Sequence, residues 1–240
     1  MLAPSIQFDP SLAEAGLRIA LVYGSGLTIA KRDEAPASLA ALLSRVRDSG
    51  ETFLSEGRKK AVRDLLRHGK YKPAGRAKPS NEYLLAAALE GSFPLVNPAV
   101  DANNAASLAY GYPASVFDLE KCGSELLLMR GGAGDSYQFN PSGQQIDLED
   151  LLCVWMRGDG GSSLPIGNPV KDSMATKVFE LCVGVVGVVY APQGPEGRDL
   201  EACAELYAGL LESQCGATAT AWTVAETGPQ QQPQLKLGKP

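Results

Sequence analysis

Polar side chains that can take part in chemistry gather in one short segment, residues 164–178, with the sequence LPIGNPVKDSMATKV. The Gly-Asn-Pro sequence inside it predicts a rigid, irregular loop, and loops on a rigid scaffold are where binding and catalytic groups usually lie. An amide, an ammonium group, a carboxyl group and hydroxyl groups follow one another there. The candidate site residues of this loop are Gly167, Asn168, Lys171, Asp172, Ser173 and Thr176.

A concentration of positive charge lies in residues 58–78, RKKAVRDLLRHGKYKPAGRAK, which we call the basic segment. It holds nine of the 22 Lys and Arg residues and one acid, Asp64, although the net charge of the chain is −5. Such a stripe on an acidic protein can steer a phosphate backbone to one face, and the alternative interpretation is a solvated helix and loop. The predicted RNA-binding residues are Lys59, Lys60, Arg63, Arg67, Lys70, Lys72, Arg76 and Lys78.

The chain offers little for nucleophilic or metal chemistry. His68 is its only histidine, so no Ser-His-Asp or Cys-His system can be assembled, and a position at a helix C-terminus is the simpler interpretation. The five cysteines are scattered and never form a C-x-x-C pair, which predicts reduced, mostly buried thiols. No Walker or dinucleotide fingerprint is present. We therefore expect neither a metal nor another cofactor.

The N-terminal sequence MLAPSIQFDPSLAEAG lacks a basic region followed by an apolar one. The longest apolar run, around residues 183–190, is too short to cross a bilayer. These patterns predict a cytoplasmic protein without a membrane partner.

Helices and strands must position these groups. Apolar, β-branched runs predict strands over 17–23, 179–190 and 217–224, and short apolar runs parted by glycines over 126–155 predict a small antiparallel sheet. The predicted helices cover 35–46, 57–68, 81–91 with Ser80 as N-cap, 101–111 and 198–211. The final strand, helix and strand predict a βαβ unit. We expect one α+β domain over 1–227 in two packed halves, followed by a disordered tail over 228–240.

Residues 79–121 carry a specific pattern of unlike residues: a helix, a short hydrophobic turn, a proline, V-D-x-x-N, a second helix, a proline and F-D-L-x-K. The residues that supply it are Pro98, Val100, Asp101, Asn104, Pro113, Phe117, Asp118, Leu119 and Lys121. This segment resembles the B3/B4 domain of the phenylalanyl-tRNA synthetase β subunit, and a weaker likeness extends through 164–178. Taken by themselves, Asp101, Asn104 and Asp118 are also typical of helix caps and turns.

The resemblance implies an α+β fold of mixed and antiparallel sheets flanked by helices. In the synthetase this domain hosts hydrolytic editing of tRNA misacylated with tyrosine. It implies no aminoacylation, because the catalytic core and its ATP-binding motifs are missing here. The family's editing loop is glycine-rich and carries an acidic residue that holds substrate or positions water. Asp172 is the residue that matches it best, although Pro169-Val170 replaces a Gly-Gly pair.

Three function classes follow. The first is a free-standing tRNA-related module that hydrolyses misacylated tRNA, with Asp172, Ser173 and Asn168 orienting water or the α-amino group and backbone amides near Gly167 stabilising the oxyanion. Gly167, Lys171, Thr176 and Asn104 are then the substrate-binding residues. The second class is a non-catalytic RNA-binding protein, and the third binds or converts a free amino-acid-like metabolite. The expected partner is tRNA, with no DNA. The first class requires the basic segment and the loop to line one cleft.

Overall fold

The computed structural model describes residues 4–30, 32–158 and 161–228 and shows an α+β fold with two four-stranded sheets. One sheet is antiparallel throughout, in the order β10-β2-β9-β3. Its strands are β2 (Leu17–Ser25), β3 (Ala114–Asp118), β9 (Gly184–Pro192) and β10 (Ala219–Glu226). All positions of β9 are buried, which explains why its sequence is a continuous apolar run rather than an alternating one.

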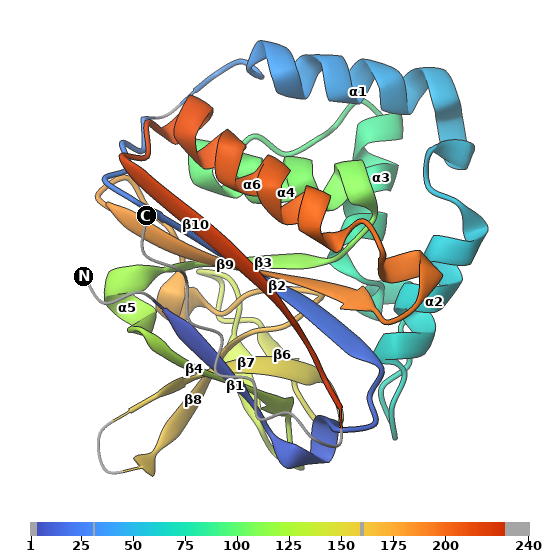
Figure 1. Ribbon diagram of the computed structural model, residues 1–240, viewed down its shortest axis with the longest axis vertical. Coiled ribbons are helices and arrows are strands. Elements are labelled where there is room, and N and C mark those ends of the chain that lie inside the picture. The colour runs from blue at the N-terminus through green and yellow to red at the C-terminus, as the bar shows by residue number, and fades with distance from the viewer. Residues whose placement is uncertain (1–3, 31, 159–160, 229–240) are drawn as a thin grey trace.

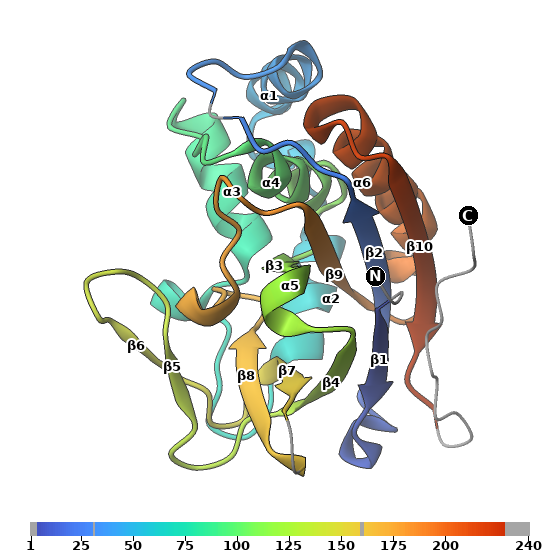
Figure 2. The same cartoon turned by 90° about the vertical axis from the view of Figure 1, so that its left-hand side faces the viewer.

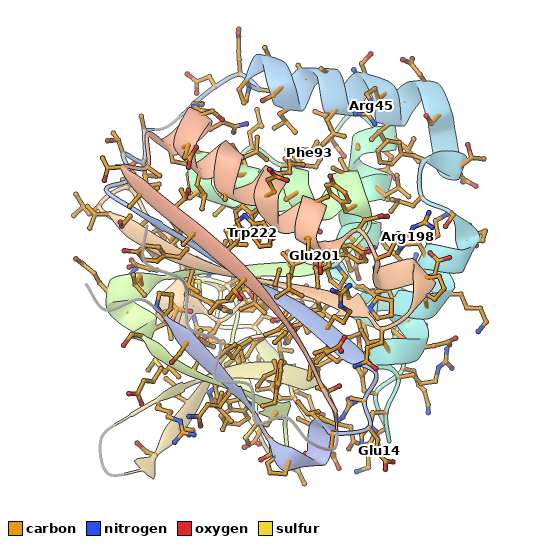
Figure 3. The ribbon with its side chains drawn as sticks, viewed as in Figure 1. Glu14, Arg45, Phe93, Arg198, Glu201 and Trp222 are labelled. Carbon is orange, nitrogen blue, oxygen red and sulfur yellow. The ribbon has the colours of Figure 1, made fainter. Side chains whose placement is uncertain are left out.

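Helices cover one side of this sheet, and the second sheet lies on the other side (Figure 1). They are α1 (Ala37–Ser49), α2 (Glu56–Leu66), α3 (Ser80–Leu89), α4 (Pro98–Tyr110) and α6 (Leu200–Cys215). Helix α6 packs against α4 and β2. Tyr207 of α6 lies so close to Gly187 of β9 that a Cβ on this glycine would lie 2.3 Å from the tyrosine ring. Glu201, in the first turn of α6 (Figure 3), accepts a hydrogen bond from Arg18 of β2.

The second sheet has the order β1-β4-β7-β8 and is mixed, because β1 runs parallel to β4 while the other pairs are antiparallel. Its strands are β1 (Ser5–Phe8), β4 (Glu125–Arg130), β7 (Leu152–Arg157) and β8 (Ser163–Gly167). A hairpin of β5 (Ser136–Gln138) and β6 (Gln145–Asp147) projects beside it. One buried cluster includes apolar residues of both four-stranded sheets, for example Ile6, Val154 and Val188.

The predicted fold class is confirmed, and so is the C-terminal βαβ unit, in a modified form. Strands β9 and β10 both run antiparallel to β2, which lies between them, so they are parallel to each other but not neighbours. Helix α6 makes the connection between them. The predicted tail lies, apart from Gly228, outside the described residues. No helix in the described ranges has the length and apolar character needed to cross a membrane.

Two predicted helix starts are wrong. Helix α4 begins at Pro98 rather than near Asp101, because the Asn97 side chain caps it by accepting a hydrogen bond from Val100 N at 3.0 Å. The buried Asp101 carboxyl accepts one from Val96 N instead, so it serves the turn before the helix. Ser80 is the first residue of α3 and not its N-cap, since Pro79 takes that position without a side-chain hydrogen bond.

Single turns complete the chain: α5 (Leu119–Cys122) and the 3₁₀ turns η1 (Pro10–Leu12), η2 (Gly50–Phe53), η3 (Gly75–Ala77), η5 (Met174–Thr176) and η6 (Pro195–Gly197). Asp118 caps α5 through Glu120 N, as its position in F-D-L suggests. All five cysteines are free and buried, in agreement with the prediction of reduced thiols. Burial raises the pKa of each thiol, so these groups stay protonated at neutral pH.

Candidate functional site

The loop that follows β8 is shaped by the side chain of Asn168, which is 1% exposed. Its Oδ1 atom accepts hydrogen bonds from Val170 N at 2.8 Å and Lys171 N at 2.9 Å, and its Nδ2 atom donates to the Tyr137 hydroxyl. Both polar atoms of this amide are therefore engaged in holding the loop. The structure gives Asn168 a positioning role, and its side chain borders the site without a free acceptor.

A cavity of about 590 Å³ opens between this loop, α4 and the β5–β6 hairpin. Figure 2 shows the hairpin and the connection from β8 to β9 on the same side of the molecule. The walls are mainly apolar, with Val100, Val116, Phe139, Val178 and Phe179 among them. Polar groups stand between these side chains. The polar lining residues are Ser80, Asn97, Asn103, Asn104, Asn168, Lys171, Asp172, Lys177 and Glu180.

The lining residues include two carboxyl groups: Glu180 is exposed, and the other is that of Asp172. Its Oδ2 atom accepts a hydrogen bond from Val116 N at 3.1 Å, and its buried Oδ1 atom has no hydrogen-bond partner in the described part of the chain. Gly167 allows this approach, because a Cβ there would lie 2.5 Å from Asp172 Oδ1 and 2.4 Å from the Phe117 ring. The glycine of the loop is thus needed for space.

Burial raises the pKa of Asp172 to about 7, against the opposing effects of the Ser115 hydroxyl, the backbone N–H of Val116 and the charge of Lys177. A carboxyl group with such a pKa exchanges its proton near neutral pH, which is the property of a general acid or base. Proximity to a cavity together with this perturbed pKa is the pattern expected of a functional carboxylate.

A buried network behind the loop holds it in place. The Tyr137 hydroxyl donates to Lys171 O at 2.5 Å, and Ser115 Oγ donates to Asn168 O at 3.2 Å. The Ser115 and Tyr190 hydroxyl groups also share a hydrogen bond at 3.1 Å. Burial raises the pKa of both tyrosines well above the ordinary value, so their hydroxyl groups remain donors. No sequence signal identifies these residues, because they come from three separate strands or loops.

Not every predicted residue lines the cavity. Among the lining residues in the described ranges are Asn104, Asn168, Lys171 and Asp172, whereas Gly167, Ser173 and Thr176 are absent from them. Ser173 is 3% exposed and accepts a hydrogen bond from Ala175 N at 3.2 Å, so it caps η5. Thr176 is buried as well. Ser173 is placed to stabilise the loop, and the structure does not bring its hydroxyl to the cavity.

The backbone amides proposed for an oxyanion hole are already used. The N–H groups of Val170 and Lys171 donate to Asn168 Oδ1, and Ser173 N donates to Ile166 O at 2.8 Å. The positive groups at the cavity are the side chains of Lys171 and Lys177. The Lys171 ammonium lies 4.2 Å from the centroid of the Phe139 ring. These amides are therefore not free to stabilise a developing negative charge, and the lysine side chains are the groups that could do so.

Sequence reasoning missed five other lining residues that carry polar groups: Ser80, Asn97, Asn103, Lys177 and Glu180. Lys177 and Asn103 belong to segments that were named for other residues, and Ser80 was assigned to a helix cap. The Ser80 Oγ and Asn103 Oδ1 atoms are buried without a hydrogen-bond partner in the described chain, as is Asp172 Oδ1. Unpaired buried polar atoms are rare in native proteins, and three of the eight in the described chain belong to residues that line this cavity.

A second space, a groove of about 510 Å³, adjoins the cavity and shares Ser80, Asn104, Val170 and Lys171 with it. Its other lining residues are Arg76, Tyr83, Leu84 and Gln144. Arg76, a residue of the basic segment, thus lines the same groove as Val170 and Lys171 of the loop.

Much of the remaining basic segment is paired with acids. The Arg63 guanidinium contacts both carboxyl oxygens of Glu82, at 2.6 Å for the Nε atom, and Lys70 Nζ lies 2.7 Å from Glu149. Lys59 pairs with Glu56 at 2.6 Å, and Lys60 with Asp64. Lys72 donates to Gly69 O. Within the described ranges, no ion pair involves Arg67, Arg76 or Lys78.

Arg58, at the start of the basic segment, has a structural role. Its guanidinium lies 4.5 Å from the centroid of the Tyr112 ring, donates to Tyr110 O, and pairs with Glu196 at 3.2 Å and Asp199 at 3.0 Å. It connects α2 to the turn before α6. His68, by contrast, is exposed. The described residues include no group of three or more His, Cys, Asp or Glu side chains that could hold a metal ion.

The fold and site together define an α+β protein with an apolar cavity that contains one carboxyl group of raised pKa. No protein-family model matches the chain, and no curated protein matches it. One solved structure that resembles it is the N-terminal fragment of the phenylalanyl-tRNA synthetase β subunit from Pyrococcus horikoshii, with a TM-score of 0.44 and 10% identity. That match covers 93% of this chain and 52% of the fragment, so the chain spans about half of its length. The likeness is a distant one.

Proposed function

We propose that this protein is a tRNA-related module that binds an aminoacyl ester in the cavity and hydrolyses it. The observation that carries the proposal is the Asp172 carboxyl group, whose buried Oδ1 atom has no partner in the described chain and whose pKa is raised to about 7. The resemblance of residues 79–121 to the editing domain of the synthetase supports the choice of substrate. The apolar walls favour an aminoacyl group with an apolar side chain.

The proposed reaction needs one water molecule and no cofactor. The Asp172 carboxylate accepts a proton from water as the water oxygen bonds to the ester carbonyl carbon. The charge that develops on the carbonyl oxygen is stabilised by the Lys171 ammonium group. The bond to the ribose oxygen then breaks, and the proton passes from Asp172 to that oxygen. The products are a free amino acid and a tRNA with a free terminal hydroxyl group.

A deacylation screen over a panel of mischarged tRNAs tests this function. The purified protein is expected to release the amino acid from at least one of them, and Asp172→Asn is expected to remove the activity, because an amide cannot act as the base. Wild-type protein that leaves every mischarged tRNA intact at high concentration would refute hydrolysis. Salt-dependent tRNA binding without deacylation selects the non-catalytic RNA-binding function instead.

The ion pairs of the basic segment favour a second candidate, a binder of a free amino-acid-like compound. Arg63 and Lys70 face Glu82 and Glu149, which reduces the field that these cations present to a phosphate backbone. The test is binding of free amino acids beside binding of tRNA. Two results together select the second function. The protein binds a free amino acid but not RNA, and charge reversal at Lys59, Lys60 and Arg63 leaves the amino-acid binding unchanged.

A further inference from the structure

We infer that the groove beside the cavity is a nucleotide subsite: it holds the 5′-phosphate and sugar of a terminal ribonucleotide whose esterified group occupies the cavity. The inference rests on the proposed function and deepens it, since it says which part of the RNA the protein recognises. It also confines that recognition to one nucleotide next to the ester, away from most of the basic segment.

Proximity of the two spaces is the first argument. Ser80, Asn104, Val170 and Lys171 line both the cavity and the groove, so the two spaces are neighbours that meet at these four residues. The groove, at about 510 Å³, is comparable in size to the cavity, at about 590 Å³. A ligand that fills both has two parts of similar bulk joined by a short link. An aminoacyl group esterified to a nucleotide has this form.

Charge is the second argument. Arg76 and Lys171 line the groove, and none of its described lining residues is acidic. Arg76 is exposed and makes no ion pair in the described chain, in contrast to Arg63, which is held by Glu82. An unpaired guanidinium in a groove without described acids suits an anion, and Arg presents a fork of donors that matches a phosphate group.

Anchoring of both cations is the third argument. The turn η3, which carries Arg76, is held at each end by a tyrosine: Tyr83 donates to Gly75 O at 3.1 Å and Tyr71 donates to Ala77 O at 2.8 Å. The backbone of Lys171, which also lines the groove, is fixed by Asn168 and by Tyr137. Rigid support of the backbone lowers the entropy cost of ordering the groove around a ligand.

The remaining lining residues suit a nucleoside. Tyr83 is 40% exposed, so its ring offers a face on which a base can stack, and its hydrogen bond to Gly75 keeps it in place. Gln144, directly before β6, and Asn104, on α4, supply amide N–H groups for the sugar or base edges, while their side-chain oxygens accept hydrogen bonds from Asn140 and Asn103.

The test compares ligands that differ by one phosphate. Binding of adenosine and of adenosine 5′-monophosphate is measured with the full chain by calorimetry, for the wild type and for Arg76→Ala. We expect the monophosphate to bind about tenfold more tightly than adenosine to the wild type, and this advantage to disappear in the variant. Arg45→Ala is the matched control, because Arg45 is an exposed arginine on α1 (Figure 3) and does not line either space. Its binding is expected to equal that of the wild type.

A second arm distinguishes a free nucleotide from an RNA end. The trinucleotide pCpCpA, with a free 3′ hydroxyl, is expected to bind at least as tightly as the monophosphate, and the same RNA extended at its 3′ end is expected to bind more weakly. Monophosphate binding without trinucleotide binding would show that the groove serves a free nucleotide and would overturn the inference. Tyr83→Ala is expected to weaken the binding of all these ligands by several-fold, and Tyr83→Phe to weaken it less.

Failure of the inference can be told from failure of the proposed function. If mischarged tRNA is hydrolysed and Arg76→Ala changes neither the KM for it nor monophosphate affinity, the nucleotide subsite is wrong while the hydrolytic function stands. If no tRNA is hydrolysed but monophosphate and trinucleotide binding still depend on Arg76, the subsite stands and hydrolysis is refuted. Melting curves of each variant establish that the loss of affinity is not a loss of folded protein.

Discussion

The basic segment and the loop after β8 both carry dense polar groups, but the fold treats them in opposite ways. In the basic segment, Arg63 is neutralised by Glu82 of α3, and Lys70 is neutralised by Glu149. Both acids lie outside the segment. In the loop, the Asp172 Oδ1 atom is buried and unpaired within the described chain. Exposed charges can be paired at little cost, whereas an unpaired buried oxygen costs about 1–3 kcal/mol and calls for a reason. The comparison therefore favours the loop over the basic segment as the position of the proposed chemistry.

The largest effect is expected from Asp172→Asn. It removes the proposed base without changing the size of the side chain, so ester hydrolysis should fall by roughly 10²- to 10⁴-fold. In the wild type, activity should rise with pH through about 7, because only the deprotonated carboxylate accepts a proton from water. The measurement is the pH profile of kcat/KM with a mischarged tRNA. A flat profile between pH 5 and pH 9 would show that Asp172 is not the base, and the loop would lose its proposed role in hydrolysis.

The same substitution makes a prediction about stability that does not depend on activity. Burial raises the pKa of Asp172 in the folded state above its value in the unfolded state, so the folded state holds the proton more tightly. The stability that this proton contributes is present at low pH and is lost as pH rises through about 7. The neutral Asn avoids the buried charge. At pH 8 the variant should thus be more stable than the wild type by roughly 2 kcal/mol, and this gain should vanish near pH 4, as measured by urea unfolding.

A smaller effect is expected from Gly167→Ala. The added Cβ would lie 2.4 Å from the Phe117 ring and 2.5 Å from Asp172 Oδ1, so the loop must shift to accept it. We expect a loss of about 1–3 kcal/mol in the free energy of unfolding, with a loss of hydrolysis as Asp172 moves. Gly209→Ala in α6 is the control, because a Cβ there meets nothing within 4 Å. That change should raise stability by roughly 0.5–1 kcal/mol, as a helical glycine is replaced.

The sequence sufficed for the elements that repeat a simple period. Strand β9 and helix α6 appear as a long apolar run and a helical pattern, and the α+β class follows from their order. The sequence also sufficed to predict that Asn168, Lys171 and Asp172 line one cavity, because residues of one short loop necessarily lie close together. Local pattern was enough in these cases.

Other features of the site depend on contacts between distant segments, which a local pattern does not contain. Tyr137 reaches the loop from β5, and Ser115 reaches it from β3. Glu82 and Glu149 neutralise cations of the basic segment from outside it, so counting charge within residues 58–78 overstates the positive field there. The start of α4 was misplaced for a local reason, since Asn97-Pro98 is itself a good start and Asp101 competes with it as a cap.

Release of a paired cation tests whether the ion pairs of the basic segment limit its binding to RNA. Glu82→Gln removes the carboxylate that holds Arg63, and the freed guanidinium should raise tRNA affinity by a few-fold if the basic segment contacts RNA. The slope of log affinity against log salt should then steepen by about one. Filter binding at several salt concentrations measures both quantities. Glu201→Gln, which removes one of the two carboxylate partners of Arg18 on β2, outside the basic segment, is the control and should change neither.

The smallest effect is expected from Lys60→Ala. Lys60 has a side chain that is 78% exposed and pairs with Asp64 within the same helix, so its positive charge is already compensated locally. Its loss should change tRNA affinity by roughly twofold or less. Arg76→Ala, at the groove, should weaken binding much more, although both changes remove one positive charge from the basic segment. Equal effects in parallel binding titrations would mean that the RNA responds to total charge along the segment, and the distinction between a paired surface and an unpaired site would then fail.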